Sequence, residues 1–159
     1  MKVICFHNPD EENGYLSNWA LSEFTVNGIS FSSMEQYMMY QKAVCFKDEE
    51  IAEKILATTD VAVIKALGRQ VKGYNDGYWN GVRQLLVYEG LKEKFTQNEN
   101  LKKLLLDTED SILAECAVND QIWGIGLSMK DSNRLEPEKW RGQNLLGYAL
   151  MLVRNWIKE

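Results

Sequence analysis

The pattern of hydrophobic and polar positions along the chain predicts a mainly helical protein. Apolar residues recur at helical spacing in several segments, namely 32–44, 48–57, 61–67, 76–95, 101–106 and 145–157. The first of these opens on Ser32-Ser33-Met34-Glu35, which has the form of a capping box. The last is strongly apolar but too short to span a bilayer, so we expect it to pack in the core.

The β signals are few. Asn27-Gly28 separates two short runs of β-prone residues, Phe24–Val26 and Ile29–Phe31. Asn-Gly between such runs is typical of a tight hairpin, because both turn residues need a positive φ. Residues 111–116 indicate one more short strand. We therefore predict a mainly α, compact helical fold with a small β-hairpin near the N-terminus.

Composition limits the classes of protein that this chain can belong to. The 159 residues are 45% hydrophobic and include only 2 Pro, so they fit a single domain over residues 1–159 with one sizeable core. We see no transmembrane segment and no signal peptide, and we expect a cytoplasmic protein without a membrane partner. The net charge of −5 argues against a large non-specific nucleic-acid interface.

Metal and histidine chemistry find little support in the sequence. The 3 Cys form no CxxC pair, and we expect them to be reduced thiols that pack as small hydrophobic residues. The 1 His cannot build a multi-histidine site. We predict no metal and no cofactor, so the chemistry must come from carboxylates, lysine, arginine, amides and aromatic rings.

Glu35 and Lys42 form the first candidate pair. They are seven residues apart on one predicted helix, which places both on one face, about 10.5 Å apart along the axis. The alternative is purely structural: Glu35 completes the capping box with Ser32, and Lys42 is solvated.

A second candidate cluster follows the strand predicted at 111–116. Glu115, Asp120 and Trp123 precede Gly124-Ile125-Gly126 and together form a polar and aromatic loop in an apolar chain. Loops held by a rigid scaffold often carry binding residues. The alternative is a turn anchored by Trp123 and capped by Asp120. The Gly-x-Gly pattern alone is weak evidence for phosphate binding.

Two further features have a functional and a structural interpretation. Trp79 and Arg83 are four residues apart on a predicted helix, so the ring and the guanidinium can flank one ligand or form a surface cation–π pair. Asn144 precedes the last helix. It can simply cap this helix, or the helix N-terminus can face an anion such as phosphate.

The order of these motifs resembles the NADAR (NAD and ADP-ribose associated) family, also called YbiA-like. The resemblance covers nearly the whole chain and is carried by these segments: Tyr15-Leu16-Ser17-Asn18-Trp19, Ser33-Met34-Glu35-Gln36-Tyr37, Gln41-Lys42-Ala43, Gly68-Arg69, Trp79 with Arg83, Lys94-Phe95, Leu104 to Thr108, Glu115 with Asp120-Gln121-Ile122-Trp123-Gly124, and Gly142-Gln143-Asn144-Leu145-Leu146-Gly147 with Val153-Arg154.

The resemblance implies a compact, mainly α fold and hydrolysis of N-glycosidic bonds. Family members cleave ribosylamino-uracil phosphates of the riboflavin pathway, and others remove ADP-ribose from modified guanine in nucleic acid. The matching polar positions comprise three catalytic candidates, Glu35, Lys42 and Asp120, and seven substrate-binding candidates, Asn18, Arg69, Trp79, Arg83, Glu115, Trp123 and Asn144. Cleavage of a ribosyl C–N bond builds positive charge at C1, which a carboxylate can stabilise.

The family motifs do not separate the substrate classes. The net charge of −5 favours a small phosphorylated ribosylamine over ADP-ribosylated nucleic acid. A local basic rim of Lys65, Arg69 and Lys72 is compatible with either substrate. The alternatives from other classes are a non-catalytic module that binds ADP-ribose or NAD-like metabolites, and a structural interaction domain.

Overall fold

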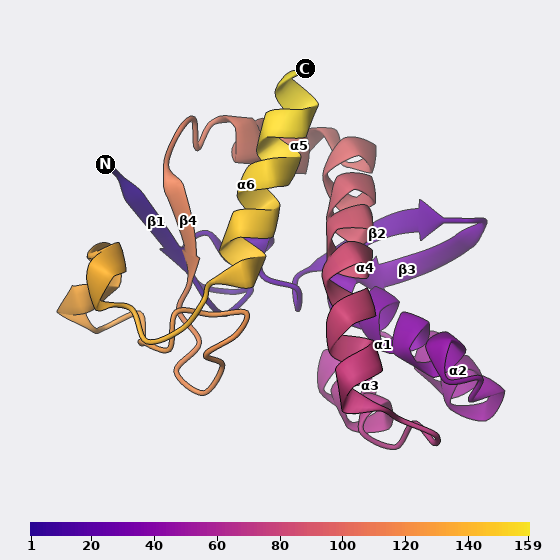
Figure 1. Ribbon diagram of the computed structural model, residues 1–159. Coiled ribbons are helices and arrows are strands. Elements are labelled where there is room, and N and C mark those ends of the chain that lie inside the picture. Colours follow the sequence, from indigo (N-terminus) through magenta and orange to yellow (C-terminus); the bar gives the residue numbers. More distant parts are fainter. The chain divides into compact units, whose positions relative to one another are not determined.

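The computed structural model describes all 159 residues and contains six α-helices and two small two-stranded sheets. The mainly α prediction is confirmed. The residue contacts divide the chain into two compact units, which we describe separately: the first combines Met1–Ala20 with Glu99–Glu159, and the second is Leu21–Asn98 (Figure 1). That residues 1–159 form one domain stays a prediction.

The second unit begins with the predicted hairpin. Strands β2 (Leu21–Val26) and β3 (Ile29–Ser33) pair antiparallel, with Val26 opposite Ile29. The two turn residues, Asn27 and Gly28, have φ values of 50° and 81°, as the turn chemistry requires. The hairpin prediction is confirmed.

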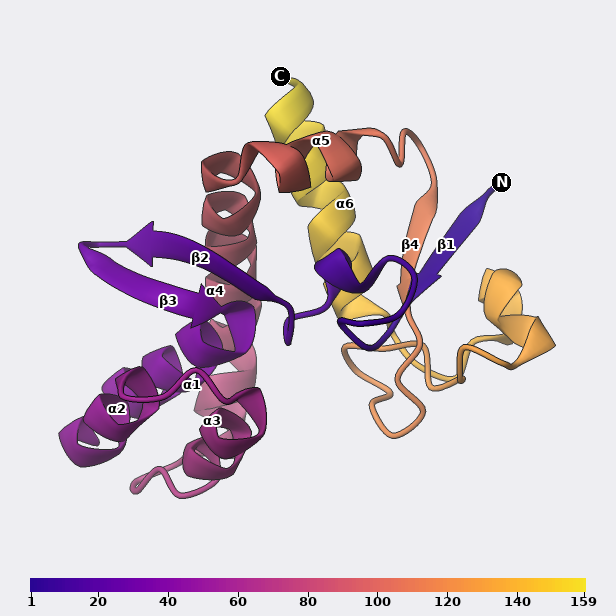
Figure 2. The ribbon, with the colours of Figure 1, turned by 180° about the vertical axis from the view of Figure 1, so that it is seen from behind.

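Four helices complete this unit: α1 (Met34–Cys45), α2 (Glu49–Leu56), α3 (Val61–Gly68) and α4 (Asp76–Gln97). Helix α1 packs against the other three helices and against β3 (Figure 2). Apolar side chains from α1, α2, α3 and the segment after α3 form a buried cluster, whose members are Ala43, Ile51, Ala52, Ile55, Ile64 and Val71. This packing holds α1 in a fixed position, and α1 carries both Glu35 and Lys42.

A glycine lets α4 approach α1 closely. A Cβ built on Gly90 would lie 2.6 Å from the Tyr37 ring and 3.0 Å from the Met34 side chain, both of which are buried residues of α1. Gly81 on the same helix has no atom within 4 Å of such a Cβ. Of these two glycines of α4, only Gly90 therefore has a packing role.

The first unit pairs two strands that are distant in sequence. Strand β1 (Val3–Phe6) runs parallel to β4 (Ile112–Glu115), with Cys5 opposite Ala114. The strand at 112–115 was predicted, whereas β1 was not. Helix α6 (Leu145–Lys158) packs against β4 and contacts α5 (Glu99–Leu106) (Figure 1). Three short 3₁₀ helices also belong to this unit: η1 (Gly14–Leu16), η2 (Ser132–Leu135) and η3 (Pro137–Lys139).

None of the helices combines the length and the apolar character that crossing a membrane would require.

We expect alanine at Gly90 and at Gly81 to change stability in opposite directions. Gly90→Ala forces a methyl group into the Tyr37 ring and should lower the free energy of unfolding by about 1–3 kcal/mol. Gly81→Ala places a better helix former at an open position and should raise it by about 0.5–1 kcal/mol. Urea denaturation of both variants measures this, and a Gly90→Ala variant as stable as the wild type would contradict the close packing.

Candidate active site

The carboxyl group of Glu35 is not used to cap α1. The N-cap residue is Ser33, whose Oγ accepts a hydrogen bond of 3.1 Å from the backbone N–H of Gln36. The Gln36 Oε1 atom accepts from the backbone N–H and the hydroxyl group of Ser32, at 2.6 and 3.0 Å. The predicted capping box of Ser32 and Glu35 is therefore wrong: Ser33 and Gln36, each one residue later, make these bonds.

Glu35 lies among positive charges. Burial raises the pKa of its carboxyl group above the ordinary glutamate value, and four cations act in the opposite direction, with Arg83 first and Lys65, Lys42 and Arg69 after it. The desolvation of the carboxyl group outweighs the field of these cations. A carboxyl group with a raised pKa is suited to donate and accept a proton near neutral pH.

Lys42 is the second member of this cluster. Burial lowers the pKa of its ammonium group, the positive charge of Arg83 adds to this effect, and Glu35 opposes it. The Lys42 Nζ atom lies 4.5 Å from the centre of the Tyr74 ring, and the Tyr74 hydroxyl group donates a hydrogen bond of 2.7 Å to Asp76 Oδ1. Sequence reasoning missed Tyr74, which lies in the connection between α3 and α4 and carries no periodic signal.

The remaining predicted residues of the second unit come from α3 and α4. Arg69 is the exposed C-cap residue of α3. Trp79 is only 3% exposed, so it is not half of a surface cation–π pair, and that alternative is wrong. Arg83 is half-buried one helical turn after Trp79 and acts electrostatically on both Glu35 and Lys42. The unit thus brings together Glu35, Lys42, Arg69 and Arg83.

In the first unit, Asn144 holds the end of β4. It is fully buried with a φ of 56°, its Oδ1 atom accepts from the backbone N–H of Glu115 at 3.1 Å, and its Nδ2 atom donates to the Leu113 carbonyl at 2.8 Å. Its side chain makes no capping bond to α6, so the predicted side-chain cap is wrong. Asn144 instead fixes the position of Glu115.

The first amides of α6 are also occupied. The N–H groups of Leu145 and Leu146 donate to the carbonyls of Ile122 and Trp123, both at 3.1 Å. These two N–H groups are therefore not available to an anion, which contradicts the predicted phosphate site at this helix end. The reason is that the preceding loop folds back on the helix and supplies carbonyl groups.

Asp120 shapes this loop. Its Oδ1 atom accepts hydrogen bonds from the backbone N–H groups of Ile122 and Trp123, at 3.0 and 2.8 Å. Trp123 is 7% exposed. The loop thus contains a turn capped by Asp120 and anchored by Trp123, as the structural interpretation of the sequence predicted. Gly126 has a φ of 73°, a backbone conformation that favours glycine, so the backbone explains the second glycine of the Gly-x-Gly pattern.

Asn18 contains an unsatisfied polar atom. Its Oδ1 atom is buried and has no hydrogen-bond partner, while the preceding Ser17 accepts a bond of 3.1 Å from the Trp19 N–H. An unpartnered buried carbonyl costs about 1–3 kcal/mol, and a ligand that supplies a donor would recover this energy. Asn18 is thus a physically motivated binding residue.

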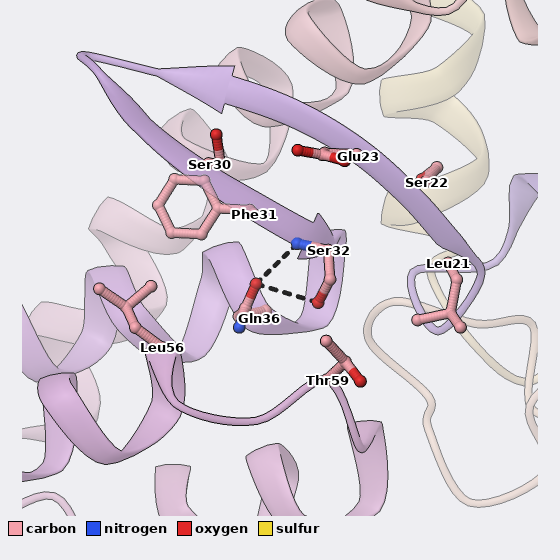
Figure 3. Close-up of a pocket in the computed structure, with 9 residues that line it drawn as sticks. All are labelled: Leu21, Ser22, Glu23, Ser30, Phe31, Ser32, Gln36, Leu56 and Thr59. Carbon is pink, nitrogen blue, oxygen red and sulfur yellow. Dashed lines mark hydrogen bonds between the residues drawn. The ribbon is translucent and has the colours of Figure 1, made fainter.

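The second unit also contains an open pocket of about 510 Å³. It is lined by the β2–β3 hairpin, the start of α1 and the connection between α2 and α3 (Figure 3). The Gln36 side chain at this pocket is already bonded to Ser32 and, through Nε2, to the carbonyls of Ile55 and Thr58. None of the predicted site residues lines this pocket.

No group of three or more His, Cys, Asp or Glu side chains is placed to hold a metal ion.

Comparison with known proteins decides the family. The model of the NADAR domain matches residues 5–158. The chain belongs to the NADAR family. The resemblance of the motif order is therefore confirmed.

Named relatives of this NADAR chain include enzymes. The N-glycosidase R617 of Acanthamoeba polyphaga mimivirus is 37% identical, over 96% of this chain and 95% of that protein. The riboflavin biosynthesis protein VVA0006 of Vibrio vulnificus is 33% identical over 98% of this chain, which spans only 39% of that longer protein. The NMR structure of Escherichia coli YbiA matches with a TM-score of 0.81 and 29% identity, covering 99% of this chain and 85% of that one.

Proposed function

We propose that this NADAR chain hydrolyses the C–N bond between ribose and an exocyclic amine of a heterocyclic base, with a phosphorylated ribosylamino-uracil of the riboflavin pathway as substrate. A hydrolase acting on N-glycosyl compounds agrees with relatives named N-glycosidases that match nearly the whole chain. The riboflavin assignment draws support from the name of the Vibrio relative. The cytoplasmic location stays a prediction.

The observation that carries the proposal is one desolvated carboxyl group inside a group of cations. Glu35 is acted on by Arg83, Lys65, Lys42 and Arg69 together. An anionic substrate needs such cations to bind its phosphate. The reaction needs a carboxylate near the sugar, because positive charge develops at C1 as the C–N bond breaks. The cluster supplies both.

Glu35 is the proposed acid and base of the reaction. Because burial raises its pKa, a larger protonated fraction is present near neutral pH than for an exposed glutamate. The protonated form can give its proton to the leaving nitrogen, and the resulting carboxylate can stabilise C1 and then accept a proton from the attacking water. Arg69 and Arg83 are the proposed partners of the substrate phosphate.

Lys42 has two proposed roles, which the experiment below separates. A ribosyl group on an exocyclic amine can ring-open to an imine, and a neutral lysine amine can exchange into it, releasing the base and forming a Schiff base with the sugar. Burial and Arg83 both lower the pKa of Lys42, which favours the neutral amine. In the simpler role, a protonated Lys42 pairs electrostatically with Glu35 and attracts phosphate.

We also propose roles for the candidate residues of the first unit, adjusted for the hydrogen bonds that they already make. Asp120 stays a proposed second catalytic carboxylate, although its Oδ1 atom already holds the loop. Asn18 is proposed to bind substrate through its unsatisfied Oδ1 atom. Both amide atoms of Asn144 are hydrogen-bonded to the backbone of β4, so we propose that Asn144 positions Glu115. Trp123, and Trp79 on α4 of the second unit, are proposed to contact the base of the substrate.

One test of the proposed function concerns the substrate. We expect the wild-type chain to release free base faster from a ribosylamino-uracil phosphate than from an ADP-ribosylated guanine in an oligonucleotide, because the net charge of −5 opposes polynucleotide binding. Glu35→Gln should lower the rate about 10²–10⁴-fold, since it removes the acid–base group. The exposed Glu53→Gln on α2 serves as the control and should retain full activity.

Initial rates with the two substrates, measured side by side by chromatography of the released base, decide which substrate the protein prefers. Faster turnover of the oligonucleotide would replace the proposed substrate by ADP-ribosylated guanine. Tight binding of either compound without any base release would favour a non-catalytic module.

A further test separates the two proposed roles of Lys42. If the amine forms a Schiff base, borohydride added during turnover should trap a sugar adduct on the wild-type protein and none on Lys42→Ala. Lys42→Arg keeps the charge but cannot form the adduct, so substantial activity in that variant would leave only the electrostatic role. The control is Lys54→Ala, which removes an exposed lysine paired with Glu50. Full activity of Lys42→Ala would eliminate both roles.

A further inference from the structure

Two of the three cysteines lie next to each other in the first unit. Cys5 is on β1 opposite Ala114, and Cys116 directly follows β4, with its N–H bonded to the Phe6 carbonyl at 2.8 Å. Residues Cys5 and Cys116 therefore lie on the same face of the two-stranded sheet, and both belong to one buried apolar cluster. The sequence, in which these residues are 111 positions apart, contains no sign of this pairing.

The surroundings make the two thiols unequal. The neighbouring Cys116 thiol lowers the pKa of Cys5, and the positive charge of Arg134 lowers it further, whereas burial opposes both. The neighbouring Cys5 sulfur and its own burial raise the pKa of Cys116, whose thiol donates to the Ala114 carbonyl at 3.9 Å. Cys5 is thus the thiol that more readily becomes a thiolate, and Cys116 is the neighbour that remains protonated.

Arg134 is held beside the pair by its own contacts. It belongs to η2, which contacts β1, its Nη1 atom donates to the Asp131 carbonyl at 2.9 Å, and its own carbonyl accepts from Trp140 Nε1 at 2.9 Å. Trp140 packs against the apolar cluster that contains both cysteines. The guanidinium group is therefore a fixed part of the environment of Cys5.

We propose that Cys5 and Cys116 form a reversible oxidation site that a peroxide converts to a disulfide. The Cys5 thiolate attacks one oxygen of the peroxide, which breaks the O–O bond, oxidises Cys5 to a sulfenic acid and reduces that peroxide to water or an alcohol. The Cys116 sulfur then attacks the Cys5 sulfur and forms the S–S bond. The sulfenic hydroxyl group leaves with the Cys116 proton as a second molecule of water.

Closing the bond requires a small movement. Cys116 lies two positions beyond the residue opposite Cys5, so a strand spacing of about 4.8 Å and a rise of about 3.3 Å per residue place the two Cα atoms about 8 Å apart. Disulfides usually need a Cα separation below about 7 Å. The end of β4 must therefore shift by about 1–2 Å along the line between the two Cα atoms, against the hydrogen bonds that the N–H groups of Glu115 and Cys116 make to Asn144 and Phe6.

The test uses the full-length protein, and its readout is independent of the proposed function. The wild-type chain is treated with hydrogen peroxide, denatured, alkylated and digested, and its disulfides are identified by mass spectrometry. We expect a Cys5–Cys116 linkage that dithiothreitol reverses, while Cys45, half-buried on α1 of the other unit, is alkylated. Cys45→Ser should form the same linkage, and Cys116→Ser should accumulate a Cys5 sulfenic acid that reacts with dimedone.

Arg134→Gln should slow formation of the linkage about tenfold, the effect of a change of one unit in the pKa of Cys5. Arg134→Lys keeps the charge and should restore most of the rate, and the exposed Lys130→Gln in the same segment should not change it. Free Cys5 and Cys116 under conditions that oxidise Cys45 would overturn the proposal. Oxidation of Arg134→Gln at the wild-type rate would overturn the role of Arg134.

Discussion

The candidate site depends on which side chain caps the start of α1, because Gln36 makes the capping contact and the neighbouring Glu35 does not. Gln36 and Ser33 make the hydrogen bonds that begin the helix, so the Glu35 carboxyl group is not consumed by capping. Burial then raises its pKa against the field of the surrounding cations. A capping carboxylate would be ionised and held by backbone amides, and it could not exchange protons with a substrate.

Much of the fold follows from local sequence. The Asn27-Gly28 turn defines the hairpin, because few other residue pairs tolerate two positive φ angles. The helices at 49–56 and 61–68 and the final helix match their apolar periodicity closely. Such elements are encoded by residues within a few positions of one another, and they determine which faces of α1 are buried. The placement of Glu35 and Lys42 on α1 is therefore a consequence of local pattern.

The features that sequence reasoning missed depend on distant contacts. The pairing of β1 with β4 joins segments more than a hundred residues apart, and it brings Cys5 to Cys116. Asn144 has the sequence context of a helix cap, yet its side chain is bonded to β4, because Gly147 lets α6 approach the Leu113 carbonyl closely. Lys94 is fully buried, and burial lowers its pKa to about 7, although its residue type favours the surface.

The central claim is that Glu35 is a desolvated carboxyl group and not an ordinary ion-paired one. The most direct measurement is a pH titration of its side-chain carboxyl carbon by ¹³C NMR, assigned with the Glu35→Gln variant. The account predicts a midpoint above the ordinary range of glutamate, since burial outweighs the cations. A midpoint at or below that range would contradict the account. It would mean that the cations dominate and keep the carboxylate permanently ionised.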